Sequence, residues 1–279
     1  MNLPSVSKWA RGALVAATMS FGLGMATQAA AVPVFEVTPG AFGSARSPFD
    51  ANFTKGGTNS LLTFADPGGG TVQGQGFLQL EGFSLNNLNI LPGVSGIGID
   101  YQLWAEFSYV TQLVSGSYGA AGSTYQIVSL TFTLYGESLS GPLSTFTTAV
   151  DSTPPSVTHG ANAKEIGSGT LIQGVASLNA LGGTAINALT SFDLTAFGKT
   201  FFTDPDPFYT LAFSEFNNTA QGVTRYTDPN TGILYISLGQ TSGGVDFNLV
   251  PEPASLALLS LGLGALGLAS RRRRQKTPA

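Results

Sequence analysis

The clearest structural pattern of the chain lies in Ile97-Gly-Ile-Asp-Tyr-Gln-Leu-Trp-Ala-Glu-Phe-Ser-Tyr109. Its odd positions are apolar, and its even positions include Asp100, Gln102, Glu106 and Ser108. Side chains of a β-strand point alternately to the two faces of a sheet, so a period of two predicts a strand with one buried face.

The same alternation recurs in Tyr125–Tyr135, where Val128, Leu130, Phe132 and Leu134 share one face. Further strands are predicted over Phe35–Thr38, Thr71–Leu85, Thr170–Ser177, Ala188–Ala196, Tyr209–Phe216, Val223–Thr227, Ile233–Leu238 and Val245–Leu249. Turn sequences separate them, and Asp228-Pro-Asn-Thr-Gly232 predicts a hairpin. Many short strands without a long amphipathic helix predict an all-β fold, an antiparallel β-sandwich of the jelly-roll-like or Ig-like kind.

The segment from Thr145 to Leu181 departs from this pattern. Thr153-Pro-Pro155 marks a break, and Ala161–Ile166 is a candidate for a short helix. The segment is expected to be a long loop or an insertion.

The charges of the chain are distributed unevenly. The 279 residues have a net charge of −4 and include no Cys. Residues 32–249 hold five basic and 15 acidic residues, a net charge of −10, because most Lys and Arg lie at the two ends. Phosphate binding needs clustered Lys and Arg, so this composition argues against a nucleic-acid partner. The lack of Cys excludes disulfides and thiolate metal sites.

Residues 1–31 have the three parts of a secretory signal peptide. Lys8 and Arg11 form the basic start, an apolar stretch runs from Ala13 to Met25, and Ala29-Ala-Ala31 supplies small residues for cleavage. The passenger domain is therefore expected to span residues 32–249.

Residues 250–279 combine three features in a fixed order: a Pro-Glu-Pro step, an uncharged stretch from Ala254 to Ser270, and an arginine cluster. The residues of the step and the cluster are Pro251, Glu252 and Pro253, and Arg271, Arg272, Arg273 and Arg274. As a helix, the uncharged stretch would be roughly 26 Å long, marginally enough for a thin hydrocarbon core. We expect a transmembrane helix here, with the arginines as its cytoplasmic stop.

This order resembles the PEP-CTERM sorting signal of exported proteins in Gram-negative bacteria. The resemblance implies an exosortase as processing partner beside the secretion machinery. It also implies an inner-membrane intermediate held by the C-terminal helix, and delivery to the cell surface or extracellular matrix. An ordinary C-terminal membrane anchor is the alternative.

A second resemblance concerns the passenger. The stretch Leu194–Phe213, with Phe201-Phe202, Pro205 and Pro207-Phe208-Tyr209, is similar to a segment shared by flocculation-associated PEP-CTERM proteins. It implies a protein that promotes cell aggregation within an exopolysaccharide matrix, and it transfers no catalytic residue.

Few side chains point to catalysis. His159 is the only histidine, and the Ser156–Gly160 stretch around it favours an exposed loop position over a catalytic triad. A carboxylate pair for glycoside hydrolysis would need two acids that converge in a cleft. The candidates are Glu81, Glu106, Glu137 and Asp100, which the strand pattern places on solvated strand faces or strand ends.

Two turns carry oxygen ligands of the kind that calcium prefers. They hold Asp204 and Asp206, and Asp228 and Asn230, although both also fit ordinary Asp-Pro turns. Calcium is thus the one cofactor that the sequence neither establishes nor excludes. Trp104 lies on the strand face opposite Leu103, so it is the aromatic residue predicted to point outward and to bind a ligand.

These observations predict an exported, non-enzymatic protein that promotes cell aggregation together with exopolysaccharide. The alternatives are a secreted carbohydrate-binding module and a polysaccharide-active enzyme that uses a carboxylate pair.

Overall fold

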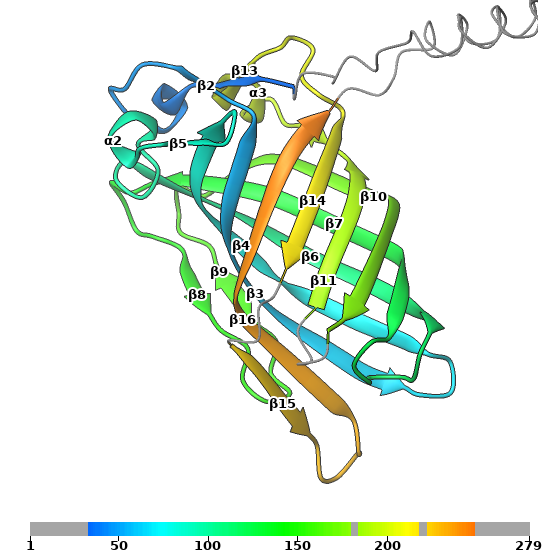
Figure 1. Cartoon of the computed structure of the whole chain (residues 1–279). Coiled ribbons are helices and arrows are strands. Elements are labelled where there is room, and N and C mark those ends of the chain that lie inside the picture. Colours follow the sequence, from blue (N-terminus) through cyan, green and yellow to red (C-terminus); the bar gives the residue numbers. More distant parts are fainter. Residues whose placement is uncertain (1–32, 180–183, 218–221, 249–279) are drawn as a thin grey trace, which may run out of the picture. The chain divides into compact units, whose positions relative to one another are not determined.

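The computed structural model describes residues 33–179, 184–217 and 222–248. Its main feature is a set of eight long antiparallel strands (Figure 1). They are β3 (Phe53–Asp66), β4 (Thr71–Leu85), β6 (Tyr101–Ser115), β7 (Thr124–Ser138), β10 (Lys164–Leu178), β11 (Thr184–Ser191), β14 (Leu211–Asn217) and β16 (Leu234–Asn248). Each pairs with the next in this order, and β16 pairs back with β3, so the sheet closes on itself.

The all-β, antiparallel prediction is confirmed, and the two halves of the closed sheet face each other like the layers of a sandwich. The strand order is a simple meander, whereas a jelly roll or an Ig domain would need Greek-key connections. Tight turns favour this order because they can join only antiparallel neighbours. The hairpin predicted at Asp228–Gly232 is one of them, and it joins β15 (Val223–Thr227) to β16.

Two details of the predicted strands are wrong. Val128 was expected inside but is 53% exposed, because a bulge in β7 shifts the alternation and Ile127 takes the buried position. The short helix proposed for Ala161–Ile166 is absent from the described chain, since β10 already begins at Lys164 and pairs with β7.

Strand β3 has no counterpart among the predicted strands. Its first inward positions are Thr54, Gly56, Thr58 and Ser60, which are buried but small. A strand without large apolar residues on one face gives no period-two hydrophobic signal. Its pairing with β4 on one side and β16 on the other makes it a strand.

Short elements complete the chain. They are β1 (Phe35–Val37), η1 (Pro39–Phe42), β2 (Phe49–Ala51), β5 (Leu88–Ile90), α2 (Pro92–Ser95), β8 (Thr145–Thr147), β9 (Ser156–Thr158), β12 (Asp193–Leu194), α3 (Gly198–Phe201) and β13 (Phe202–Asp204). Strands β1, β2 and β13 form a small sheet at the upper end in Figure 1. There Phe35 makes edge-to-face contacts with Phe202 and Phe247. Aromatic residues of the stretch 194–213 thus help to close one end of the core.

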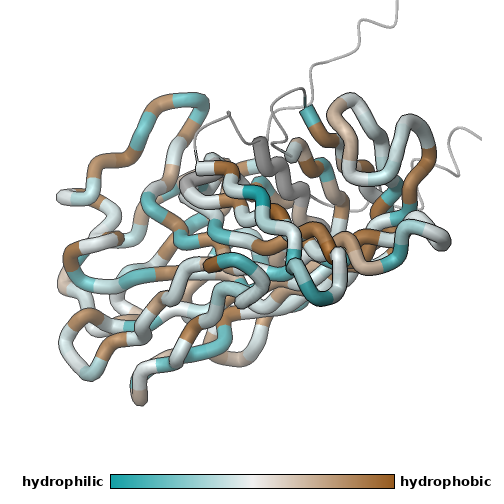
Figure 2. Tube along the Cα trace, turned by 90° about the horizontal axis from the view of Figure 1, so that it is seen from below, coloured by the Kyte–Doolittle hydropathy of each residue, from teal (hydrophilic) through white to brown (hydrophobic). Residues whose placement is uncertain are grey.

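The interior holds two hydrophobic clusters. One includes Phe35, Leu103 and Phe201, and the other includes Leu62 and Ile236. The partly buried Phe107 and Phe132 pack against both clusters. Along the strands, hydrophobic and hydrophilic segments alternate over short distances, as Figure 2 shows. This is the pattern of strands with one face inside and one outside.

Within the described residues, no helix is long and apolar enough to cross a membrane.

Candidate functional site

The predicted outward aromatic, Trp104, does lie on the outer face of the sheet, but it is 0% exposed. The segment between β7 and β10, residues 139–163, folds over this face, and we call it the cover segment. Its Phe146 packs edge-to-face on Trp104, while Tyr135 of β7 stacks beside the indole at 5.6 Å. The prediction that Trp104 is free to bind a ligand is therefore wrong, because the cover segment occupies its surface.

The cover segment also brings His159 to a carboxylate. The imidazole Nε2 lies 2.5 Å from Oε1 of Glu106, and the same oxygen accepts a hydrogen bond of 3.0 Å from Nε1 of Trp104. The histidine is an exposed loop residue, as predicted, and its ring also contacts Tyr135 at 4.5 Å. Sequence reasoning missed the pair because 53 residues separate its members.

Glu137 of β7 holds the cover segment on the outer face of the sheet by hydrogen bonds. Its side chain is 0% exposed and accepts hydrogen bonds from Nε2 of Gln102 at 2.5 Å, from the backbone N–H of Ser144 at 2.6 Å and from Oγ of Ser144 at 2.9 Å. The Ser144 hydroxyl in turn accepts a hydrogen bond from the N–H of Gly160. The carboxylate thus binds Ser144 near the start of the cover segment directly, and Gly160 near its end through the Ser144 hydroxyl.

The strand register keeps Glu106 and Glu137 apart. Glu106 lies opposite Thr133, and Gln102 lies opposite Glu137, so four residues, roughly 13 Å of strand, separate the two carboxylates. Paired carboxylates of glycosidases lie about 5–9.5 Å apart. Glu81 is exposed and lines a separate pocket beside Gln102.

Asp100, the fourth candidate acid, has a structural partner. Its Oδ2 accepts hydrogen bonds from Oγ of Ser44 at 2.6 Å and from Nε of Arg46 at 2.7 Å. These two bonds, the serine's first, lower the pKa of Asp100 below its usual value. The acid therefore joins the N-terminal part of the described chain to the start of β6.

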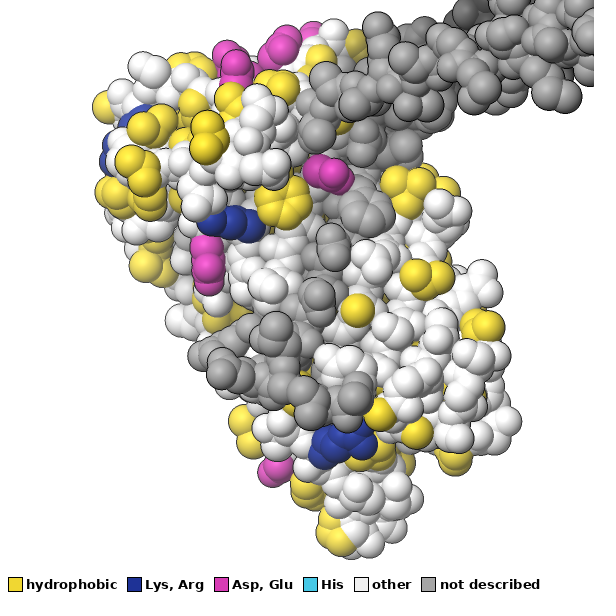
Figure 3. All heavy atoms as spheres, viewed as in Figure 1, with side chains coloured by type: hydrophobic (Ala, Val, Ile, Leu, Met, Phe, Trp, Pro, Cys, Tyr) yellow, Lys and Arg dark blue, Asp and Glu magenta, His cyan; other side chains and the backbone are white. Residues whose placement is uncertain are grey.

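A groove of about 640 Å³ lies on the outer face over β7, β10 and β11. Its described lining carries no charge and includes three amide side chains, Gln126, Gln173 and Asn187. Val175 lies opposite both Gln126 and Asn187, so these two amides flank it in one row that spans roughly 10 Å across three strands. Among the described residues, none of the three amides has a side-chain hydrogen-bond partner. In Figure 3, the surface over β10 and β11 shows no charged side chain.

Residues 249–274, which begin directly after β16, match the family model of the PEP-CTERM protein-sorting motif. The chain carries a PEP-CTERM sorting signal. Such a signal implies export in a Gram-negative bacterium, a membrane-anchored intermediate and processing by an exosortase. No match to the chain was found among curated proteins or among solved structures.

The sequence elements of the PEP-CTERM signal lie outside the described residues. This holds for the Pro-Glu-Pro step at 251–253, the predicted membrane helix and the arginines at 271–274, as it does for the predicted signal peptide at 1–31.

The oxygen ligands proposed for calcium fall at two separate places in the PEP-CTERM passenger. Oδ1 of Asp228 accepts a hydrogen bond of 2.8 Å from the N–H of Asn230, and this bond lowers the pKa of Asp228. The bond also gives Asp228 a structural role in the turn. Asp204 lies in β13 opposite Glu36, and Asp206 follows it. No group of three or more His, Cys, Asp or Glu among the described residues could hold a metal ion. Calcium binding at these residues stays a prediction.

Proposed function

We propose that the exported passenger is a non-catalytic binding module of the cell surface or extracellular matrix, and that it promotes cell aggregation by holding exopolysaccharide. The observation that carries this proposal is the amide groove. Side-chain amides both donate and accept hydrogen bonds, which suits the hydroxyl groups of a neutral sugar polymer. The described lining of the groove carries no charge, so these polar contacts would be hydrogen bonds and not ion pairs.

Two further features support this role. The PEP-CTERM signal follows the last strand directly, so the closed sheet would be delivered as one unit. The stretch Leu194–Phe213 resembles flocculation-associated proteins, and its buried Phe201 and Phe202 suggest that such proteins share this end of the core.

Binding can be tested with the processed protein and exopolysaccharide prepared from the producing bacterium. We expect the double substitution Gln126→Ala and Gln173→Ala to reduce co-sedimentation with the polymer at least fivefold. Gln75→Ala is the matched control, because Gln75 is an exposed amide on the outer face of β4, away from the groove. Equal binding by both proteins would refute the groove as the polymer site.

Cell aggregation and sorting need separate strains. Deletion of the gene is expected to abolish flocs, and truncation after Leu249 is expected to abolish surface retention. Normal flocs in the groove variant, together with lost polymer binding, would favour a carbohydrate-binding module without a role in aggregation.

The second candidate is a polysaccharide-active enzyme, and the short Glu106–His159 contact is the feature that would favour it. Release of reducing ends from the exopolysaccharide by the native protein, and its loss in Glu106→Gln, would establish this alternative. We expect no release from either protein.

A further inference from the structure

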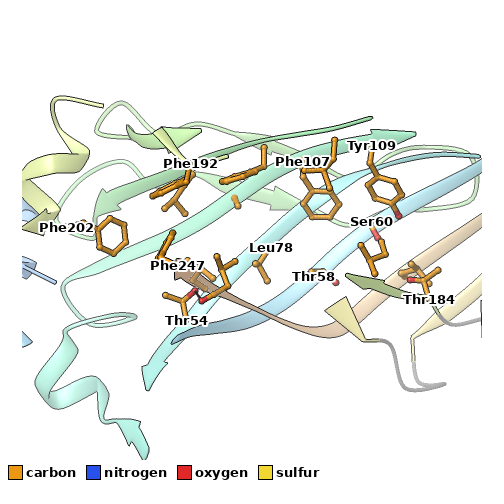
Figure 4. Close-up of a pocket in the computed structure, with 18 residues that line it drawn as sticks. Thr54, Thr58, Ser60, Leu78, Phe107, Tyr109, Thr184, Phe192, Phe202 and Phe247 are labelled. Atoms are coloured by element: carbon orange, nitrogen blue, oxygen red, sulfur yellow. Dashed lines mark hydrogen bonds between the residues drawn. The ribbon is translucent and has the colours of Figure 1, made fainter. Parts of the chain in front are cut away.

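The interior of the closed sheet leaves little room for a ligand. An internal cavity of about 50 Å³ lies where the two hydrophobic clusters meet (Figure 4). Phe107 and Phe132 line one part of it, and β3 lines another with Thr54, Thr58 and Ser60. An apolar cavity that holds one benzene molecule has about 150 Å³. A further binding surface is therefore to be sought on the outside of the sheet.

Residues 86–96, which include β5 and α2, form a loop at one end of the closed sheet, and we call it the apolar loop (Figure 1). Its Leu88, Leu91 and Val94 are between 51% and 74% exposed. Residues 82–99 carry no charge. In Figure 3, this part of the surface, at the upper left, shows hydrophobic side chains together with those of Lys and Arg. Exposed apolar side chains that gather in one place mark a contact with a protein or a membrane.

The fold holds the apolar loop in a fixed position on the sheet. Asn86 and Asn87 have φ angles of 51° and 65°, so the chain makes a tight turn from β4 into β5. The side chain of Arg46 donates a hydrogen bond to a carbonyl oxygen of α2. Nζ of Lys55 donates one of 2.7 Å to Oδ1 of Asn89. The exposure of the apolar side chains is thus a stable feature of the surface.

The strand register places the apolar loop near the end of the last described strand. Thr54 of β3 lies opposite Val245 of β16 on one side and opposite Phe83 of β4 on the other. Because β16 and β4 are both antiparallel to β3, they run toward the same end of the closed sheet. Two strand spacings, roughly 10 Å, separate them. Strand β16 ends at Asn248, close to the turn in which β4 leads into the loop.

The PEP-CTERM signal brings this end of the sheet close to a bilayer. The signal implies a membrane-anchored intermediate, and the expected membrane helix begins at Ala254. The six peptide units from Asn248 to Ala254 can span at most roughly 20 Å. Before processing, the apolar loop is therefore within reach of a phospholipid surface.

We propose that the apolar loop docks on the phospholipid bilayer that anchors the C-terminal segment, with Leu88, Leu91 and Val94 inserted between the lipid headgroups. Transfer of these side chains out of water favours docking, and the anchor raises the effective concentration of the loop at the surface. Lys55 forms no ion pair among the described residues, so its ammonium group is available to a lipid phosphate. Docking holds this end of the sheet on the membrane until the exosortase acts. The surface is independent of the amide groove over β7, β10 and β11.

The lack of Cys allows the loop to be probed with a single fluorophore. V94C carries the polarity-sensitive dye NBD, in protein that keeps its sorting signal and is reconstituted in vesicles of phosphatidylethanolamine and phosphatidylglycerol without other proteins. We expect its emission to shift to the blue and to rise about twofold over the same variant truncated after Leu249 in buffer, and a nitroxide-labelled lipid to quench it. V114C is the matched control, because Val114 is 64% exposed and lies near the other end of the sheet. Its emission should stay that of a dye in water.

A second variant separates docking from the effect of the tether alone. Leu88→Ser with Leu91→Ser should reduce the quenching of the dye at position 94 about threefold, with an unchanged circular dichroism spectrum, because both side chains are exposed. Quenching that is unchanged in this variant, or equal emission at positions 94 and 114, would overturn the proposal. A blue shift without nitroxide quenching would assign the loop to a second copy of the chain. No shift in these vesicles would assign it to a different protein partner, and either result also overturns the proposal.

Discussion

Replacement of Glu137 by alanine should release the cover segment from the outer face of the sheet. The native carboxylate accepts three hydrogen bonds, two of them from Ser144 and one from Gln102. In the alanine variant, the Gln102 amide and the N–H and hydroxyl of Ser144 lose their acceptor. The cover segment limits the access of water that could replace it. The contact of Ser144 with Gly160 then loses its support as well.

The expected cost follows from the number of donors left unpaired. At about 1 kcal/mol for each of three donors, the low end of the usual range, Glu137→Ala lowers the free energy of unfolding by about 3 kcal/mol. For a domain of this size, 1 kcal/mol shifts the melting temperature by roughly 2–4 °C, so a decrease of about 9 °C is expected.

Thermal melting and tryptophan fluorescence of the processed protein measure this effect. Without the predicted signal peptide, which contains Trp9, Trp104 is the only tryptophan in the chain. Because Phe146 and His159 of the cover segment pack on Trp104, release of the segment should red-shift its emission and expose it to acrylamide.

Glu165→Ala is the matched control, since Glu165 is an exposed acid on neighbouring β10. Its melting temperature should change by less than about 2 °C. The reasoning is refuted if Glu137→Ala melts like this control while Trp104 stays inaccessible to the quencher.

Two other predictions concern the closed sheet. Gly56→Ala should lower the free energy of unfolding by about 2 kcal/mol, because the added Cβ would lie 1.9 Å from the carbonyl oxygen of Gln79. Gly68→Ala is the control and should leave the stability unchanged, because no atom lies within 4 Å of the position of its Cβ. Urea unfolding measures both variants, and equal midpoints would contradict the prediction. Burial raises the pKa of Asp246, so its charged form destabilises the fold above that raised pKa. Asp246→Asn should therefore stabilise the protein at pH 7, with a gain that fades as the pH falls through the raised pKa toward 3.8; a gain independent of pH in urea titrations would count against this cause.

Local patterns predicted much of the fold. Strand β4 begins and ends at the predicted residues, as does β15, because each is bounded by turn sequences. The bulge at Val128 was not predictable from alternation alone, since it depends on how β6 and β7 pair. Strand β3 was missed for a different reason: its inward residues are small. The same small residues of β3 line the internal cavity. Their lack of large apolar side chains therefore explains both why the strand was missed and why the cavity exists.

The candidate sites were less predictable than the strands. Alternation correctly placed Trp104 on the outer face, but its burial depends on Phe146, which is far along the chain. The groove amides Gln126 and Asn187 are ordinary strand residues until the register of three strands brings them into one row. Neither arrangement leaves a trace in the local sequence.

The sequence by itself determined most of the long strands, the hairpin at Asp228–Gly232 and the sorting signal at 249–274, because period-two alternation, turn residues and the order of the C-terminal features are all local. Only the tertiary structure decided that the sheet closes through β3 and β16, that the cover segment buries Trp104, and that Glu106 meets His159. Closure rests on the antiparallel pairing of β16 with β3, in which residues such as Val245 and Thr54 lie opposite each other. The backbone hydrogen bonds of such a pairing do not depend on the side chains, so the local sequence does not reveal it.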